Sequence, residues 1–215
     1  EADWCIGEFL KTLEDEGILE NTLIIFSSDN GPVLNDGYYD DAVERIGNHD
    51  QNGGLRGGKY SLFEAGTRVP FITYWKGKIE PKKSDALISQ IDILASVAKL
   101  TGADFNSSDS EELLDVLLGK SDEGREQLIL EASTRTAYRK GNWLMIPPYK
   151  GPAVAAQVNI ELGNSPDFQL YDLGADIGQQ ENLAKSNPDK LEEMLAGYKG
   201  IMGVLHSEVE ALELK

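Results

Sequence analysis

The sequence has 215 residues, of which 40% are hydrophobic, so it can bury a core and is not expected to be disordered as a whole. The 37 acidic residues outnumber the 20 basic ones, and the net charge of −17 argues against nucleic acid or an anionic membrane surface as a partner. The single cysteine, Cys5, excludes an internal disulfide, and no apolar stretch approaches the roughly 18 residues of a membrane span.

The chain opens with the pattern of a helix followed by a strand. Apolar residues spaced i, i+3, i+4 and i+7 between positions 6 and 13 predict a helix, and Gly17 is placed to end it. The run TLIIF at 22–26 is typical of a strand in a parallel sheet that is buried on both faces. The run VPFITYW at 69–75 adds only one more strand. We therefore expect the other strands of a larger sheet to lie upstream of Glu1.

A second helix and a change of composition follow. The segment SQIDILASVAKLTGA at 89–103 predicts a helix with Asp92 as its N-cap and Gly102 as its stop. Residues 104–124 then become rich in acidic and small side chains around one short helix. This segment is the predicted boundary between two parts of the chain.

The last third of the chain has the pattern of antiparallel strands. The segments QLILEAS, RTAYRKGNWLMIP and DFQLYDL predict strands, with Lys140-Gly141-Asn142 as a hairpin turn. A closing helix is predicted with Pro188 in its first turn. The fold class is therefore α/β: the downstream part of a larger sheet, followed by a small α+β subdomain with antiparallel strands and a closing helix.

Polar residues follow the first predicted strand directly, in the sequence SSDNG. Ligands of open α/β sheets bind beyond the carboxyl ends of the strands, where Asp29 and Asn30 fall. A carboxylate and an amide oxygen suit Ca²⁺ or Mg²⁺, whereas the scarcity of Cys and His argues against zinc. The alternative is a simple turn, because Asp, Asn and Gly are common turn formers. Calcium takes roughly six to eight oxygen ligands, so a metal here would need ligands from elsewhere.

A glycine-rich basic segment, GGLRGGKYSLFEAGTRVP, occupies residues 53–70. Glycines allow close approach of the backbone to a ligand, and a lysine on such a loop can serve as a point charge for a tetrahedral oxyanion. We assign that role to Lys59, which next to a metal would suit phosphoryl or sulfuryl transfer. Arg68, just before Val69-Pro70, is interpreted as a structural arginine that ties loops together.

Three of these motifs together resemble a known family. NTLIIFSSDNGP and LRGGKYSLFEAGTRVPFITYW are similar to the second half of the sulfatase family, the arylsulfatase-type enzymes with an alkaline-phosphatase-like fold. FQLYDLGADIGQQENLA resembles the C-terminal signature of the same family. The resemblance implies that residues 1–103 form the downstream part of the catalytic α/β domain, that 104–124 connect, and that 125–215 form the C-terminal antiparallel subdomain with its helix.

The resemblance also implies a chemistry. Members of the family are calcium-dependent sulfuric ester hydrolases; Asp29 and Asn30 match their Asp-Asn metal ligands, and Lys59 matches the lysine that binds the sulfate and the leaving oxygen. Their nucleophile is a formylglycine made from the first residue of a Cys-x-Pro-Ser-Arg segment or its serine equivalent. No such segment occurs here, and Cys5 in DWCIGE does not match it. The formylglycine is expected upstream, and this chain alone is expected to lack activity.

Substrate selection is expected in the loop between the two motifs, because loops vary while the scaffold holds them. In this loop Tyr38, Tyr39 and His49 could contact a sugar or aryl group. His49 and Arg56 are the candidate substrate-binding residues for a sulfated sugar or an aryl sulfate. The alternative for His49 is a solvated loop histidine.

Two other functions remain open at this point. One is a phosphate or phosphonate ester hydrolase of the same superfamily. The other is a non-catalytic module that binds carbohydrate or another subunit through the antiparallel subdomain. Neither nucleic acid nor a membrane is an expected partner, whereas a homodimer could form through apolar surface left exposed by a truncated sheet. The family resemblance implies a periplasmic or extracellular location.

Overall fold

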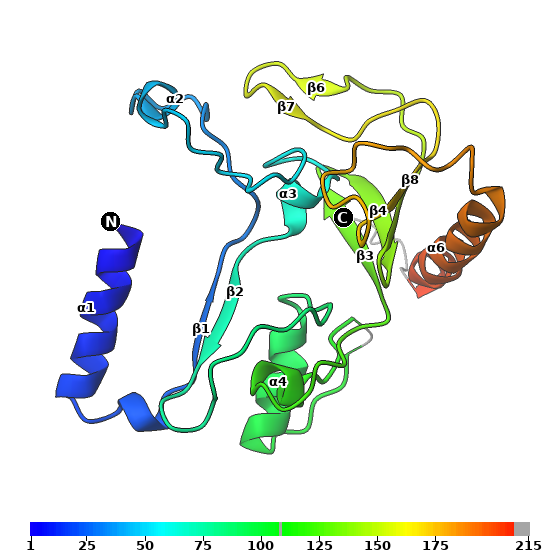
Figure 1. Cartoon of the computed structure of the whole chain (residues 1–215). Helices are drawn as coiled ribbons and strands as arrows, with labels where there is room; N and C mark the ends of the chain where they lie inside the picture. Colours follow the sequence, from blue (N-terminus) through cyan, green and yellow to red (C-terminus); the bar gives the residue numbers. More distant parts are fainter. Residues whose placement is uncertain (108, 209–215) are drawn as a thin grey trace, which may run out of the picture. The chain divides into compact units, whose positions relative to one another are not determined.

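The computed structural model describes residues 1–107 and 109–208, and these form two compact units (Figure 1). Unit 1 consists of Glu1–Ser28 and Pro70–Glu126, and unit 2 consists of Asp29–Val69 and the chain from Gln127 onward. Among the described helices, none combines the length and the apolar character needed to cross a membrane. The units divide the chain differently from the ranges 1–103, 104–124 and 125–215, which stay a prediction about the domains of a longer protein.

Unit 1 contains the predicted opening helix and the predicted middle helix. Gly17 and Gly102 follow these helices in the left-handed conformation, with φ of 70° and 72°, as expected for residues that end a helix. The unit's elements are α1 Ala2–Asp15, the 3₁₀-helix η1 Leu19–Asn21, β1 Ile24–Ser27, β2 Phe71–Tyr74, α4 Asp92–Thr101 and α5 Leu114–Leu117.

The two strands of unit 1 form where the sequence predicted strands, but they pair differently. β1 and β2 are antiparallel, with Ile24 opposite Tyr74 and Ser27 opposite Phe71. The parallel arrangement is therefore wrong for this pair, because an apolar run indicates a strand without indicating the direction of its neighbour. Burial on both faces is also wrong for the described structure, in which Phe26 and Ile72 are exposed.

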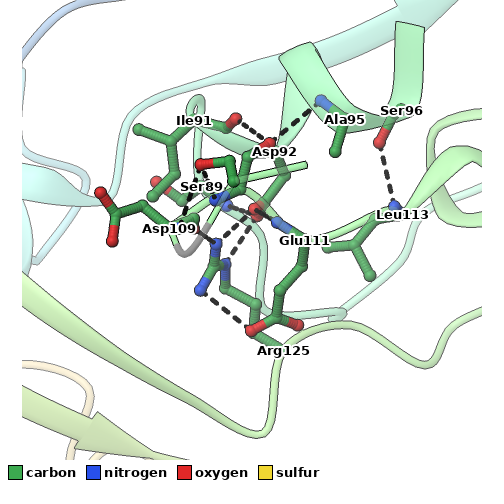
Figure 2. A network of polar contacts seen from close by, with 11 residues as sticks. Ser89, Ile91, Asp92, Ala95, Ser96, Asp109, Glu111, Leu113 and Arg125 are labelled. Atoms are coloured by element: carbon green, nitrogen blue, oxygen red, sulfur yellow. Dashed lines mark hydrogen bonds and ion pairs between the residues drawn. The ribbon is translucent and has the colours of Figure 1, made fainter. Parts of the chain in front are cut away.

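Asp92 has a different role from the predicted N-cap. Ile91 occupies the cap position, and Asp92 is the first residue of α4 with a buried carboxylate. Figure 2 shows this carboxylate accepting hydrogen bonds from the Arg125 guanidinium, from the Ser89 N–H at 2.9 Å and from the Glu111 N–H at 2.9 Å. These contacts, called here the Asp92 network, join the start of α4 to the segment that leads into β3.

Unit 2 is built on a four-stranded antiparallel sheet in the order β3-β4-β5-β8. The predicted strands are confirmed, and Gly141 (φ 55°) lies in the predicted hairpin turn between β4 and β5. The elements of the unit are α2 Ala42–Arg45, α3 Glu64–Thr67, β3 Gln127–Ala132, β4 Arg135–Lys140, β5 Trp143–Ile146, β6 Val154–Ala155, β7 Ile160–Glu161, β8 Gln169–Asp172 and α6 Pro188–Glu208. Antiparallel sheets and a C-terminal helix make the chain a mixed α/β protein, as expected.

Alternate residues of the sheet pack on its two faces. One face, with Tyr138, Met145 and Leu170, packs against Met194 and other apolar residues of α6. The opposite face packs against Leu62 and Phe63, which come from the glycine-rich segment. Residues of that face are Ala137, Leu144, Ile146, Tyr171 and Leu173. The segment that carries Lys59 is therefore part of the core of unit 2, which explains why 29–69 cluster with the C-terminal sheet.

Candidate functional site

Two loops of unit 2 that carry predicted site residues lie side by side. The Gly31 N–H donates to the Gly66 carbonyl at 2.9 Å, and the Lys59 N–H donates to the Pro32 carbonyl at 2.9 Å. Asp29 and Asn30 directly precede the first of these contacts. The structure thus brings together the backbone segments of all three residues that the sequence assigned to a metal and an oxyanion.

Two glycines make this approach sterically feasible. A Cβ atom on Gly31 would lie 1.6 Å from the Ala65 carbonyl oxygen, and a Cβ on Gly58 would lie 2.8 Å from the Pro32 carbonyl oxygen. Both neighbours are backbone atoms, which cannot move aside as a flexible side chain could. Glycine at these positions is therefore required for the two loops to meet.

Lys59 is half-buried and lies next to an aromatic ring. Its Nζ atom is 5.5 Å from the centroid of the Tyr60 ring, within the range of a cation–π contact. Within the described residues the structure gives this ammonium no ion pair with a carboxylate. A compact cation without an internal counter-ion is suited to bind an anion from outside the chain.

Asp29 and Asn30 offer oxygen ligands at the start of the same loop. The Asp29 side chain is exposed, and the half-buried Asn30 donates from Nδ2 to the Gly31 carbonyl at 3.0 Å, which fixes the orientation of its amide. Across residues 1–107 and 109–208, no group of three or more His, Cys, Asp or Glu side chains could hold a metal. The pair fits calcium by its hard oxygen chemistry but only as part of a ligand set.

Arg56 is bound within the chain. Its guanidinium makes a two-point contact with the Glu161 carboxylate, at 2.7 and 3.1 Å, and donates from Nη1 to the Gln179 carbonyl at 2.7 Å. It also lies 4.1 Å from the centroid of the Phe63 ring. Hydrogen bonding to Glu161 raises the pKa of Arg56, and the same contact lowers the pKa of Glu161. Arg56 thus ties the glycine-rich segment to β7, while its contact with substrate stays a prediction.

His49 lies in the exposed part of the loop that precedes the glycine-rich segment. Its backbone N–H donates to the Ile46 carbonyl at 3.1 Å. The neighbouring Asp50 accepts hydrogen bonds from the Asn52 and Gly54 N–H groups, and these lower the pKa of Asp50. Tyr38 and Tyr39 are also exposed. These contacts order the loop, and the role of His49 toward substrate stays a prediction.

Arg68 contacts a carboxylate four positions earlier in the chain, and its role in tying loops together stays a prediction. Its Nε donates to the carboxylate of Glu64, which is only 1% exposed and also lies 3.5 Å from an Arg139 nitrogen. The buried carboxylate between two arginines joins α3 to β4.

Other residues that hold the glycine-rich segment 53–70 around Lys59, called here the lysine loop, were not predicted. Gln179 is fully buried with φ of 52°, and its Oε1 accepts the Glu64 N–H at 2.7 Å. Arg135 donates to the Tyr60 carbonyl at 2.7 Å. Gln179 is 115 positions from Glu64 in the chain, and Arg135 is 75 positions from Tyr60. Gln179 falls in a motif that the sequence singled out, but nothing local to either residue indicates its distant partner.

Comparisons with known proteins identify the family to which the sequence is similar. The sulfatase family model matches residues 1–103. An N-acetylgalactosamine-6-O-sulfatase of Bacteroides thetaiotaomicron is 46% identical over 198 residues, which cover 90% of this chain and 39% of the relative. Human arylsulfatase A is 28% identical over 228 residues, which cover 98% of this chain and 43% of the relative.

The chain belongs to the sulfatase family. A solved structure from Bacteroides thetaiotaomicron, whose description refers to metabolism of multiple glycosaminoglycans, superposes with a TM-score of 0.89 and 44% identity over 93% of this chain and 42% of that one. The fold is therefore that of the sulfatases. The chain spans about two fifths of the length of these relatives, in agreement with the downstream part that the motifs indicated.

Proposed function

We propose that the protein to which this chain contributes hydrolyses the sulfate ester of a sulfated amino sugar. The observation that carries the proposal is the pair of backbone hydrogen bonds, Gly31 to Gly66 and Lys59 to Pro32, that joins the Asp29-Asn30 loop to the lysine loop. A relative named N-acetylgalactosamine-6-O-sulfatase, at 46% identity, supports both the reaction and the substrate class.

Each residue would have a separate task. The Lys59 ammonium would bind sulfate oxygens and stabilise the negative charge that develops on the leaving ester oxygen. Asp29 and Asn30 would supply part of the ligand set of a calcium ion, which when bound polarises the sulfate group. The formylglycine nucleophile would come from outside this chain. His49 and Arg56 would lie at the rim, where a sugar could contact them.

Hydrolysis assays on the complete protein test the proposal. We expect turnover of N-acetylgalactosamine 6-sulfate with calcium and little turnover of the 4-sulfate or of an aryl phosphate. Lys59→Ala should lower kcat/KM by about 100-fold or more, since it removes a charge that acts in the transition state. Lys185→Ala removes an exposed lysine of the same unit and should leave turnover unchanged.

Other outcomes would contradict the proposal in different ways. Turnover of the phosphate ester alone would assign the protein to the phosphate or phosphonate hydrolases of the superfamily. Binding of the sugar without any turnover would favour the non-catalytic module. For the metal, Asp29→Asn should weaken calcium binding in titration calorimetry, and unchanged affinity would remove Asp29 from the ligand set.

A location outside the cytoplasm is part of the same proposal. It is supported by the family resemblance. Cell fractionation of the native host, followed with an antibody to this chain, would test it, and recovery in the cytoplasm would contradict it.

A further inference from the structure

We propose that Arg135 is a positioning residue for Lys59. The Arg135 guanidinium holds the carbonyl of Tyr60, the residue next to Lys59, and in this way fixes the turn from which the lysine side chain projects. The inference rests on the proposed function, because it concerns the residue assigned to bind the sulfate.

Arg135 is a buried cation whose described partners are neutral. It begins β4, is 7% exposed, and donates to the Tyr60 carbonyl at 2.7 Å, to the Leu162 carbonyl at 3.0 Å and to the Asn164 side-chain oxygen. Among the residues that the structure describes, no carboxylate forms an ion pair with it. Burial lowers the pKa of Arg135, because a charged group loses solvation free energy in the interior. We therefore explain the position of this cation by the hydrogen bonds that it donates to carbonyl groups and not by attraction to a counter-ion.

The turn that Arg135 contacts is strained at Tyr60. The Ser61 N–H donates to the Gly58 carbonyl at 3.0 Å, so Lys59 and Tyr60 are the two central residues of a β-turn. Tyr60 has φ of 74°, the left-handed conformation that a type II turn requires at its third position and that glycine or asparagine normally adopts there. A tyrosine favours the type I form, in which the peptide between the two central residues is rotated. Arg135 binds the carbonyl of the following peptide, between Tyr60 and Ser61, and thereby helps to hold Tyr60 in its left-handed conformation.

The rest of the loop is held by other contacts. Leu62 and Phe63 are buried in the sheet face, and the Leu62 N–H donates to the Leu162 carbonyl at 3.1 Å. Leu162 also accepts from Arg135, so the same residue joins the guanidinium to the loop. Loss of Arg135 should therefore change the turn at 58–61 while the loop stays attached to the sheet.

A double-mutant cycle in the complete protein tests this role. Arg135→Met should lower kcat/KM for the sulfate ester by about tenfold, mainly through kcat, since the misplaced ammonium stabilises the transition state less. In the Lys59→Ala background, Arg135→Met should lower kcat/KM by less than about threefold, because a residue that acts through Lys59 then has no side chain to position. A merely structural role would give the same fold-loss in both backgrounds.

Matched variants separate positioning from folding. Arg135→Lys keeps the charge and one donor and should recover part of kcat. If Arg135→Met does not fold, the same cycle is run with Arg135→Lys, for which we expect a loss of about threefold that again disappears without Lys59. Arg125→Lys is the control, since the Arg125 side chain is also largely buried but its described partners all lie in unit 1. It should lower thermal stability and leave kcat of the folded enzyme unchanged.

The outcomes distinguish this inference from the proposed function. Full activity of Lys59→Ala would overturn the proposed function itself. Loss of activity in Lys59→Ala, together with wild-type kcat in both Arg135 variants or with additive losses, would overturn the positioning role alone.

Discussion

Unit 1 and unit 2 bury their apolar side chains to very different degrees. Unit 2 has an apolar cluster on each face of its sheet, with Ala137, Leu144, Met145, Ile146 and Leu170 fully buried. In the described part of unit 1 the buried apolar side chains are Leu19 and Leu117. Its exposed large apolar residues are Trp4, Phe9, Ile18, Phe26, Ile72, Tyr74, Ile91, Leu94, Leu100 and Phe105.

The interior of unit 1 is polar instead. Asp92 and Ser96 of α4 are buried, and their oxygens accept backbone N–H groups of the segment that follows the helix (Figure 2). Unit 1 is thus held by directional hydrogen bonds, and it presents an apolar surface of the kind that further protein covers. Unit 2 packs its own core, and the lysine loop is part of that core. A precise site is better supported on the closely packed unit, where the supporting side chains have little freedom.

The largest expected effect concerns the polar interior of unit 1. Arg125→Met would leave the carboxylate of Asp92 buried without its counter-ion, so we expect unit 1 to lose about 4 kcal/mol of stability. Hydrogen exchange resolved along the chain would show faster exchange in α4, while the strands of unit 2 keep their protection. Arg45→Met is the control, because its ion pair with Asp41 is exposed and should be worth less than about 1 kcal/mol. Equal losses in the two variants would mean that the Asp92 network does not hold unit 1 together.

The next effect concerns the apolar core of unit 2. Leu144→Ala removes a fully buried side chain from the sheet face that packs on Leu62 and Phe63, and should cost about 3 kcal/mol. Leu94→Ala makes the same chemical change at an exposed position of unit 1 and should stay within about 0.5 kcal/mol. Chemical denaturation of this chain would measure both. A large loss for Leu94→Ala would show that unit 1 has an apolar core after all.

The contrast between the units also shows what a sequence can predict. Helix ends were predicted correctly at Gly17 and Gly102, because a left-handed residue after a helix is a local requirement. The hairpin at Gly141 was predicted for the same reason. Asp92 was misread, since a helix-starting aspartate looks alike whether it caps the helix or binds an arginine 33 positions away.

The candidate site shows the same difference between residues with a local sequence signal and residues whose partners are distant in the chain. The motifs identified Asp29, Asn30 and Lys59, and the glycines that surround them already suggested close backbone approach. The residues that hold the loop, among them Arg135 and Gln179, could not be found, because their partners are set by the packing of unit 2 and not by neighbours in the chain.

The smallest effect concerns the ion pair between Arg56 and Glu161, and it has a defined pH dependence. Hydrogen bonding to Arg56 lowers the pKa of Glu161 below its ordinary value of 4.5, so the unfolded chain binds this proton more readily than the folded one. The contribution of the pair is therefore complete above about pH 4.5 and disappears as the pH falls through the lower pKa of the folded state. Because half of the Glu161 side chain is exposed, solvent screens the pair and we expect only about 0.5 kcal/mol.

The difference in unfolding free energy between the wild-type chain and Glu161→Gln, measured across this pH range, isolates that contribution from the other carboxylates. Glu181→Gln, which removes an exposed carboxylate of the same unit, should change stability little at any pH. The Arg56–Glu161 and Arg125–Asp92 pairs are both two-point contacts and differ mainly in burial. If Glu161→Gln were as costly as Arg125→Met, burial would not decide how much an ion pair contributes to stability. A small loss that vanishes in acid would show that this half-exposed ion pair adds little to the stability of unit 2.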